Sequence, residues 1–569
     1  MIRISSVKIP TDELNDVGFY KAVAHKLKIG IKDILKLKPV KISIDARKKE
    51  NIFYVCSFDA EIKNETKIIK RLNSKDISKP EKNTYNPFAE YNRDKLTEIL
   101  TRITGDTGYK RPLIVGSGPA GLICTYKLAE AGLKPILIER GSDVDTRKSK
   151  VDTFWNGGAL DPDSNVQFGE GGAGTFSDGK LNTMIKDPEG RIKEVYRAFI
   201  DNGADESILY MNKPHIGTDR LCVIVKNLRN RIIALGGEVR FSTCLTDIYT
   251  EKDENGTETV TGAQLNGNEK ISCDIIVLAI GHSARDTFAM LKKHSVPMEK
   301  KSFAVGIRVQ HPQAMINEAQ YGTSVDKLPA ADYKLTCNLE NGRSVYSFCM
   351  CPGGYVVNAS SEKGRLCVNG MSYSGRNGKH ANSAIVVSVS PDDYPGDDVL
   401  AGVEFQRRLE ENAYNSLNGE IPVQCLKSFM SDEHPEIQAS PDNKPSCKGK
   451  FGYYDLNKIL PSFICESVKK AFPEFGRHIS GFDRDDTLLL GLESRTSSPV
   501  RINRGSDFQS IGIKGLYPAG EGAGYAGGIT SAAVDGLKIY ENIIINYLNS
   551  EIKFEKANCF VLGTEVEKS

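Results

Sequence analysis

Residues 111–140 read RPLIVGSGPAGLICTYKLAEAGLKPILIER, and this stretch decides the fold. The apolar run before Gly116 predicts a strand, the GSGPAG segment predicts a tight turn, and the apolar spacing after it predicts a helix. A second apolar run predicts another strand that ends in Glu139, 23 positions after Gly116. A strand, a GxGxxG turn, a helix and a second strand with an acidic end are the fingerprint of a dinucleotide-binding unit. The sequence therefore predicts a Rossmann-like α/β domain.

Each residue type in this unit has a physical role toward a dinucleotide. Gly116 permits the tight turn, Gly118 lets the backbone approach a pyrophosphate, and Gly121 lets the helix pack closely on the strand. The free amide groups and positive dipole end of the helix face the phosphates. Glu139 is placed to accept hydrogen bonds from the adenosine ribose, and its charge disfavours the 2′-phosphate of NADP. The cofactor-binding residues expected here are Gly116, Gly118, Pro119, Ala120, Gly121 and Glu139.

Two later segments bear on whether the dinucleotide is NAD or FAD. Residues 273–282, CDIIVLAIGH, predict an apolar strand that ends at Gly281. Residues 515–536, GLYPAGEGAGYAGGITSAAVDG, predict a strand, a glycine-rich turn and a helix of small residues. Together with the first unit, these segments resemble the glutathione-reductase-type superfamily of FAD flavoproteins, in which three such elements occur in this order.

The resemblance implies further cofactor residues. Gly520 and Glu521 stand where the superfamily carries an acidic residue, usually aspartate, beside the ribityl and pyrophosphate side of FAD. The helix that opens at Gly528 and Ile529 would direct its amide groups at the flavin pyrimidine. Leu245 corresponds by pattern to the residue whose backbone pairs with adenine, and the bland alternative is a core leucine.

Seven stretches carry a closer resemblance to one family. It is the family of uncharacterised FAD-dependent dehydrogenases with a dedicated FAD-dependent-protein C-terminal domain, and the similarity covers nearly the whole chain, including SIDARK at 43–48. This resemblance implies FAD binding and an oxidoreductase activity without a particular substrate. The stretches are KPHIGTDRL (213–221), LAIGHSARDTF (278–288), FAVGIRVQHPQ (303–313), FCMCPGGYVVNAS (348–360), NGMSYSGRNGKHANSA (369–384), GLESRTSSPVRI (491–502) and PAGEGAGYAGGITSAAVDG (518–536).

The expected fold class is α/β, with a Rossmann-like FAD-binding domain of glutathione-reductase type, an inserted α+β substrate domain and a small N-terminal α+β domain. The chain divides accordingly. We expect a small basic α+β domain at 1–73, a linker at 74–109, the first part of the FAD-binding domain at 110–284, the substrate domain at 285–510, the closing part of the FAD-binding domain at 511–550 and a tail at 551–569.

A glycine-dense segment follows Glu139. Residues 165–183 read NVQFGEGGAGTFSDGKLNT, and such a loop can wrap backbone amides around a phosphate or a flavin edge. Related flavoproteins carry an arginine and then a glycine turn in this region. The candidates are Arg140, Arg147, Gly172, Gly174 and Thr175, and the alternative is a mobile surface loop.

Catalytic residues are harder to assign because the flavin itself holds the electrons. His282 follows a strand end, and Arg495 in ESRTSSP suits recognition of a carboxylate or phosphate unless Glu493 occupies it in a structural ion pair. Cys351 and Cys349 form a CxC in an apolar run, which favours strand core or pocket lining. The sequence shows no metal-ligand set. It also shows neither a second nicotinamide fingerprint nor a redox CxxC, so the electrons come from the substrate, from a visiting NAD(P)H or from a redox partner protein.

The composition is that of a soluble globular protein, with 40% hydrophobic and 26% charged residues among 569. Residues 1–100 hold 21 basic and 14 acidic residues, whereas the whole chain carries a net charge of only +2. The start lacks a signal-peptide pattern, no apolar window is long enough to span a membrane, and the 13 cysteines show no disulfide spacing, so we expect a cytoplasmic protein.

The functional prediction is an FAD-dependent oxidoreductase, a dehydrogenase or reductase, that transfers a hydride between a non-covalently bound FAD and an unidentified small organic substrate. Two alternatives remain open. One is an FAD-dependent enzyme that modifies tRNA through its basic N-terminal domain, although that domain lacks the interleaved aromatic residues of a nucleic-acid surface. The other is a flavin-binding redox sensor without turnover. The oligomeric state is not predicted.

Overall fold

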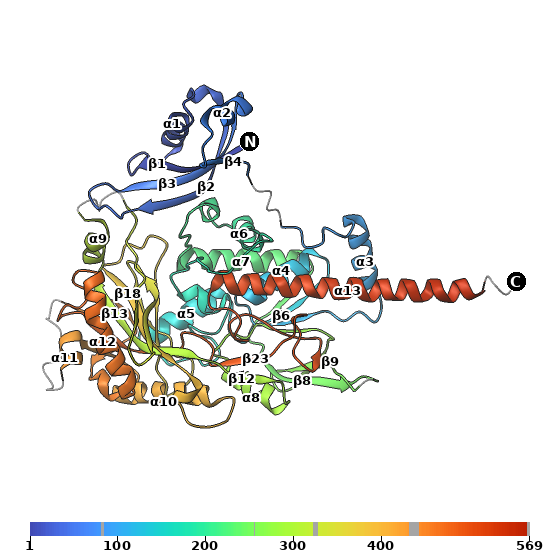
Figure 1. Cartoon of the computed structure of the whole chain (residues 1–569). Helices are drawn as coiled ribbons and strands as arrows, with labels where there is room; N and C mark the ends of the chain where they lie inside the picture. The colour runs from blue at the N-terminus through green and yellow to red at the C-terminus, as the bar shows by residue number, and fades with distance from the viewer. Residues whose placement is uncertain (81–84, 255, 323–327, 432–442, 566–569) are drawn as a thin grey trace.

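A computed structural model describes residues 1–80, 85–254, 256–322, 328–431 and 443–565 (Figure 1). At its centre lies a parallel five-stranded sheet with the order β25-β11-β5-β6-β7. Its strands are β5 (Leu113–Val115), β6 (Ile136–Ile138), β7 (Glu238–Arg240), β11 (Ile276–Leu278) and β25 (Leu516–Pro518).

Both faces of this sheet are covered, which explains why its inner strands are continuously apolar. Ile114, Leu137 and Val277 point into a core built with helices on one face. Leu113 and Ile138 point into a second core on the other face. The helices of the first face are α3 (Arg93–Gly105), α4 (Pro119–Glu130), α6 (Arg191–Asp201), α7 (Thr218–Ala234) and α13 (Ile529–Glu565), and α5 (Val144–Trp155) lies beside α7.

Helices α4 and α13 lie side by side because small residues meet between them. A Cβ atom on Gly536 would come within 2.1 Å of the Ala120 carbonyl oxygen. This contact holds the start of α13 next to the start of α4. Helix α13 stays buried in the core as far as Leu548, and its C-terminal part extends beyond the body (Figure 1).

The second face is covered by an antiparallel meander. Strands β8 (Leu245–Lys252), β9 (Glu258–Leu265) and β10 (Glu269–Ser272) form it, with β24 (Ile513–Lys514) added in parallel to β9. Helix α8 (Arg285–Lys293) packs against β8, and β12 (Met298–Lys300) pairs with β23 (Val500–Ile502) to lead the chain into and out of the next unit.

That unit is a seven-stranded sheet with the order β14-β15-β18-β13-β22-β19-β21. Strands β13 and β18 are its buried centre. The strands are β13 (Phe303–Pro312), β14 (Thr336–Asn338), β15 (Ser344–Cys351), β18 (His380–Val389), β19 (Ile421–Cys425), β21 (Phe451–Tyr453) and β22 (Leu488–Glu493). A small sheet adds β16 (Tyr355–Asn358), β17 (Val368–Met371) and β20 (Cys447–Lys448), and the helices are α9 (Gln313–Tyr321), α10 (Ala401–Ser416), α11 (Leu426–Met430) and α12 (Ser462–His478).

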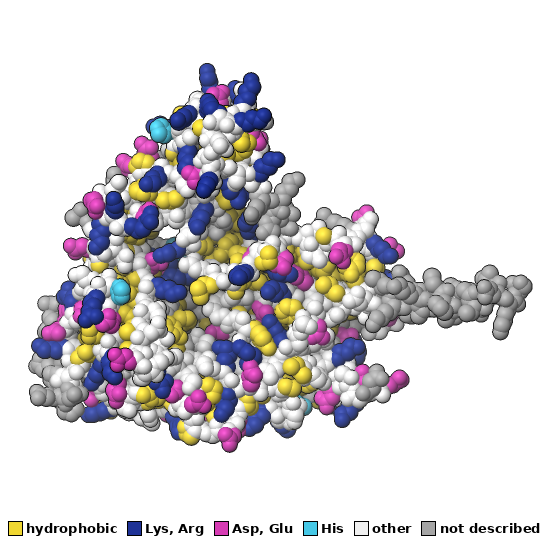
Figure 2. All heavy atoms as spheres, in the orientation of Figure 1, with side chains coloured by type: hydrophobic (Ala, Val, Ile, Leu, Met, Phe, Trp, Pro, Cys, Tyr) yellow, Lys and Arg dark blue, Asp and Glu magenta, His cyan; other side chains and the backbone are white. Residues whose placement is uncertain are grey.

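The N-terminal unit is a four-stranded sheet with the order β2-β3-β1-β4 and two helices. Its elements are β1 (Ile2–Pro10), α1 (Asp16–Leu27), β2 (Ile34–Asp45), β3 (Phe53–Ile62), α2 (Glu65–Leu72) and β4 (Ile77–Ser78). The unit is joined to the body through Ile42, whose amide donates to Tyr210 O at 2.7 Å and whose carbonyl accepts from Asn212 N at 2.8 Å. Lysine and arginine side chains gather on it in Figure 2, in line with the basic excess of residues 1–100.

The region expected as a linker contains regular structure. Strand β4 joins the N-terminal sheet, and helix α3 buries Ile99 and Leu100 in the core shared with α4 and α13. The two-residue strand β4 is too short to give a sequence signal, whereas the apolar residues of α3 do stand at helical spacing, at Leu96, Ile99, Leu100 and Ile103. Helix α13 also runs past residue 550, where we expected the tail to begin. The division into domains stays a prediction. Within the described residues, no helix is both long and apolar enough to cross a membrane.

Candidate functional site

A cavity of about 380 Å³ lies at the carboxyl ends of β5, β11 and β25, where ligands bind in open α/β sheets. Three chain segments form one side of it: the turn from β5 to α4, residues 279–284 after β11, and the stretch from Gly520 to the start of α13. The opposite wall comes from the glycine-rich loop and from the seven-stranded sheet, through Phe348, Cys349 and Glu493.

The glycines around the cavity fall into two groups. A Cβ atom on Gly116 would lie 2.4 Å from Ala279 O, and one on Gly121 would lie 1.9 Å from Gly116 O, so these two allow close packing within the protein. A Cβ atom on Gly118 or Gly281 would meet no described atom within 4 Å. These two glycines therefore leave open space for a ligand against the backbone.

Glu139 lines the cavity, yet its carboxylate is used by the protein itself. Its Oε2 accepts from the amide and hydroxyl of Ser117 at 2.9 and 2.7 Å, and its Oε1 accepts from the amides of Gly141 and Gly169 at 2.9 and 3.0 Å. These four hydrogen bonds join the fingerprint turn to the glycine-rich loop. Glu139 thus shapes the cavity in addition to the ribose contact that the sequence predicts.

Glu139→Gln is expected to destabilise the protein by about 1–3 kcal/mol. One carboxylate oxygen becomes an NH2 group, which cannot accept the two hydrogen bonds that this oxygen receives. FAD affinity should fall as well, since both loops depend on this carboxylate. Urea unfolding of the cofactor-free protein and FAD titration measure the two effects. Glu130→Gln at the exposed end of α4 is the matched control. Unchanged stability with weaker FAD binding would mean that Glu139 acts on the ribose alone.

The structure corrects the roles predicted for Arg147 and Thr175. The Arg147 side chain is fully buried and donates to carbonyl oxygens of the loop, among them Asn165 O and Glu170 O at 2.8 Å, and to Thr175 Oγ1 at 2.7 Å. Burial lowers the pKa of Arg147 to about 10. Neither side chain lines the cavity. Both hold the loop from inside, and the loop then presents Gly172 and Gly174 to the cavity.

Arg140 and Leu245 do line the cavity, together with Pro119, Ala120 and Ile529. The Arg140 guanidinium binds Asp286 at 2.8 Å and lies over the Phe168 ring at 4.5 Å. Its charge is therefore balanced within the protein. Leu245 is buried at the start of β8.

His282 is held by the acidic residue that the resemblance placed near the flavin. Its Nδ1 lies 3.1 Å from Glu521 Oε1, and both side chains line the cavity. The buried Nε2 of His282 has no hydrogen-bond partner among the described residues. An unpartnered buried nitrogen is costly unless a ligand binds it. His282 therefore offers a hydrogen-bonding atom to a bound molecule.

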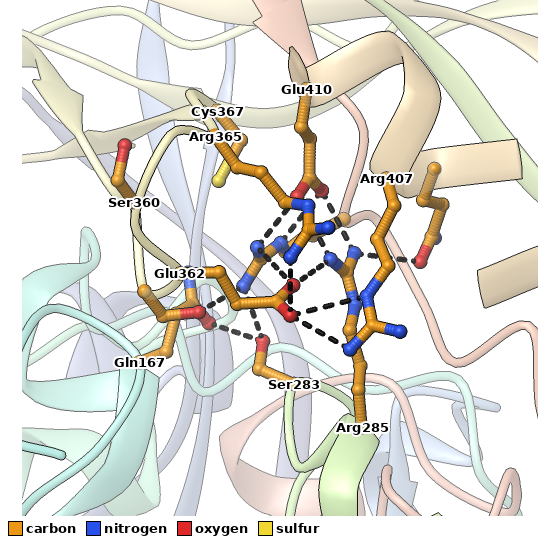
Figure 3. A network of polar contacts seen from close by, with 12 residues as sticks. Gln167, Ser283, Arg285, Ser360, Glu362, Arg365, Cys367, Arg407 and Glu410 are labelled. Carbon is orange, nitrogen blue, oxygen red and sulfur yellow. Dashed lines mark hydrogen bonds and ion pairs between the residues drawn. The ribbon is translucent and has the colours of Figure 1, made fainter. Parts of the chain in front are cut away.

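Figure 3 shows the buried ionic network around Glu410. Arg495 belongs to this network, and its predicted alternative partner Glu493 was wrong. Its Nε and Nη2 donate to the two Glu410 oxygens at 2.9 and 2.7 Å. Glu410 also binds Arg285. Because the cluster is buried, these ion pairs are needed to balance its charges. Glu493 binds Arg308 instead.

The same network contradicts the prediction that Arg495 forks a substrate anion. Its planar fork already holds Glu410, and its Nη1 donates to the hydroxyls of Ser283 and Ser361. Figure 3 shows Gln167 beside Ser283, so the network reaches the cavity wall. Arg495 positions that wall.

The two cysteines of the CxC differ in position. Cys349 lines the cavity, whereas Cys351, the sequence candidate, is fully buried behind it. A hydrogen bond from Cys351, aided by Arg308 and Lys180, lowers the pKa of the Cys349 thiol against the effect of burial. Burial raises the pKa of Cys351. The sulfur exposed to the cavity is therefore that of Cys349.

Comparison with known proteins gives three matches to families. Residues 302–496 match the family described as FAD-dependent protein, C-terminal domain-like, residues 114–156 match the NAD(P)-binding Rossmann-like domain, and residues 1–61 match a domain of unknown function. An uncharacterised protein of Clostridium beijerinckii is 46% identical over 549 residues, which is 95% of this chain and 98% of that protein. The chain belongs to this family of FAD-dependent proteins. Its cofactor is FAD.

Weak similarities to solved structures include a protein in complex with FAD, a dehydrogenase and a reductase-like protein. CtdE in complex with FAD is 12% identical with a TM-score of 0.28, and the match covers 80% of this chain and 93% of that one. L-proline dehydrogenase from P. horikoshii is 11% identical with a TM-score of 0.32, covering 76% and 93%. A geranylgeranyl bacteriochlorophyll reductase-like protein from Thermoplasma acidophilum is 14% identical with a TM-score of 0.34, covering 78% and 82%. Similarities this weak carry no argument about activity.

The cavity of this FAD-dependent protein fits its cofactor. The open space at Gly118 and Gly281 leaves room for a dinucleotide. The first turns of α4 and α13 line the cavity, so their free amide groups can bind a ligand there. The unpartnered Nε2 of His282 adds a polar atom for it.

Sequence reasoning missed several wall residues. Lys180 and Asp178 line the cavity, and Asp178 is paired with Arg376, far along the chain. Gln167 and Asn369 also line it. The sequence signal for these wall residues was their position within or next to glycine-rich stretches. Within the described ranges, no set of three or more metal-ligating side chains comes together.

Proposed function

We propose that this protein is an FAD-dependent oxidoreductase that transfers a hydride between FAD and a small organic substrate, on a glutathione-reductase-type layout. One observation supports this proposal above the others. A single cavity is walled on one side by three dinucleotide-binding segments and on the other by the seven-stranded sheet. A substrate at this junction would touch both the cofactor and the sheet.

The cofactor residues have distinct tasks in this proposal. Gly116, Gly118 and the first turn of α4 would hold the pyrophosphate, and the first turn of α13 would face the flavin ring. Bound FAD would supply two-electron chemistry, which the protein directs by position and by exclusion of water. His282 can hold or accept a proton at Nε2, because Glu521 fixes its ring through Nδ1.

The charged groups of the substrate wall are already paired. Glu493 binds Arg308, Arg495 binds Glu410, and Asp178 binds Arg376 and lies 4.0 Å from the ammonium group of Lys180. These pairs argue against the anionic substrate predicted from Arg495. We therefore propose a neutral polar substrate that is recognised by hydrogen bonds from groups such as the Asn369 side chain, with NAD(P)H or a redox partner protein as the second electron source.

Anaerobic spectroscopy tests this function. The oxidised holoprotein is mixed with metabolite pools, and separately with NADH and NADPH in a stopped-flow instrument, while the flavin absorbance is followed. We expect a small neutral metabolite or a nicotinamide to bleach the flavin within the time of turnover. Heat-denatured protein with free FAD is the control. A flavin that neither class reduces, and that no metabolite reoxidises after chemical reduction, would favour a redox sensor without turnover.

A further inference from the structure

Cys349 and Cys351 are brought together by an irregularity in β15. The register of β15 against β18 shifts between Phe348 and Cys351, and Cys349 has a φ of 44°. Residues two apart in a regular strand are separated by about 6.6 Å between Cα atoms, near the upper limit of about 4.4–6.8 Å for a disulfide. A bulge with a left-handed residue departs from this regular geometry, so the two side chains need not point to opposite faces of the sheet.

The two sulfurs interact in the reduced protein. The Cys351 thiol donates to the Cys349 carbonyl oxygen at 3.2 Å, and its proximity lowers the pKa of the Cys349 thiol. A thiol with a lowered pKa beside a second cysteine favours disulfide formation, since the thiolate is the reactive species.

A buried cation stands behind the pair. Arg308 is fully buried, and its Nη1 lies 3.2 Å from Cys349 O and 3.8 Å from Cys351 Sγ. Asn382, opposite Cys351 in the sheet, keeps a buried amide nitrogen without a partner among the described residues. Arg308 favours negative charge on sulfur at this place, while Glu493 balances Arg308 from the other side.

A short chain of contacts links the pair to the cofactor segments. Lys180 of the glycine-rich loop donates to the carbonyl oxygen of Met350, between the two cysteines. Its neighbour Leu181 accepts from Thr530 in the first turn of α13 at 2.8 Å. Cys349 therefore lines the same cavity as the start of α13, on the opposite wall.

The other cavity cysteine differs. Cys244 lies next to Leu245, where the adenine was predicted, and burial raises its pKa. Cysteines in the cores, such as Cys124 and Cys367, also have a raised pKa. The activated thiol and its neighbour are thus confined to the substrate wall.

We propose that Cys349 and Cys351 form a redox-active dithiol–disulfide couple that exchanges electrons with FAD. On oxidation, the S–H bonds of both cysteines break and an S–S bond forms, while two electrons and two protons pass to oxidised FAD and give reduced FAD. In the reverse direction, reduced FAD reduces the disulfide to two thiols and becomes oxidised FAD. Cys349 is the sulfur that faces the cavity, and Cys351 is the resolving partner. The proposal rests on the proposed oxidoreductase function and adds a second electron store to it.

The first test uses the cofactor-free protein. It is equilibrated in dithiothreitol buffers of graded redox state, alkylated, digested with trypsin and weighed. Residues 344–363 lie between Arg343 and the cleavage site after Lys363, and Cys349 and Cys351 are the cysteines of this peptide. We expect this peptide to lose two hydrogens and both alkylation sites in oxidising buffer. Cys351→Ser should abolish that change, and Cys337→Ser on the neighbouring strand β14 should not.

The second test counts electrons in the holoprotein. Oxidised protein is titrated anaerobically with dithionite while the flavin absorbance is followed. The wild type should take up two electron pairs for each FAD, and Cys351→Ser should take up one. The dithiol proposal would be overturned if the wild type took up one electron pair for each FAD and both thiols were still alkylated in oxidising buffer. That result would leave FAD binding intact. A protein that holds no FAD would instead contradict the proposed function, and the first test would still report on the cysteines.

Discussion

Gly118→Val is expected to leave the protein folded while it loses its FAD. The backbone at Gly118 has a φ of −71°, which valine adopts without strain, and an added Cβ would meet no described atom within 4 Å. The side chain would instead fill the space of the pyrophosphate and remove at least one hydrogen bond to a charged group. Such a bond contributes about 1.5–3 kcal/mol, so FAD affinity should fall by about 10- to 100-fold.

The measurement is FAD titration of the cofactor-free protein, with thermal unfolding as the check on folding. Gly105→Val at the end of α3 is the matched control, because a Cβ there also meets open space and lies far from the cavity. Normal FAD affinity in Gly118→Val would place the dinucleotide elsewhere. A loss of affinity together with a lower melting temperature would indicate a packing defect instead.

Glu410→Ala is expected to destabilise the protein by about 3–5 kcal/mol, the cost of leaving a buried charge unpaired. Glu410 is fully buried and holds the forks of both Arg285 and Arg495 (Figure 3). Its removal would leave two buried guanidinium groups with one acid, Glu362, to share. Denaturant unfolding measures the loss. Glu404→Ala on the same helix removes the exposed partner of Arg407 and should cost about 0–1 kcal/mol.

The effect of Glu410 should depend on pH in a defined direction. Arg285 and Arg495, against the effect of burial, hold the pKa of Glu410 far below its ordinary value of 4.5. A carboxylate with a lowered folded-state pKa stabilises the protein above the unfolded-state pKa and loses this contribution as pH falls. The difference in unfolding free energy between the wild type and Glu410→Ala should therefore be full near neutral pH and shrink below about pH 4.5. A difference that is independent of pH would mean that lost packing, rather than charge, accounts for the effect.

The sequence was informative where local patterns determine structure. The first βαβ unit follows from apolar runs and from glycines that only a tight turn or a close approach requires, as at Gly116 and Gly121. The comparisons confirm a Rossmann-like domain at 114–156 and the FAD cofactor. Helix α3 was missed although Leu96, Ile99, Leu100 and Ile103 stand at helical spacing, and the core that they join is built by α4 and α13.

The site was less accessible to sequence reasoning because its contacts are long-range. Arg495 is separated by 85 residues from Glu410, whereas the predicted partner Glu493 stands two positions away. Because side chains alternate between the two faces of a sheet, the pairing of β22 with β13 places Glu493 beside Arg308 instead. Similarly, no pattern in YSFCMC shows that a bulge turns Cys349 toward the cavity.

The most direct measurement is acid precipitation of the purified protein followed by quantification of the released flavin. The purified protein should be yellow and release one FAD for each chain into the supernatant, because backbone amides and hydrogen bonds would hold FAD without a covalent link. Flavin that stays in the pellet would contradict non-covalent binding. A colourless protein that takes up no added FAD would contradict the account as a whole.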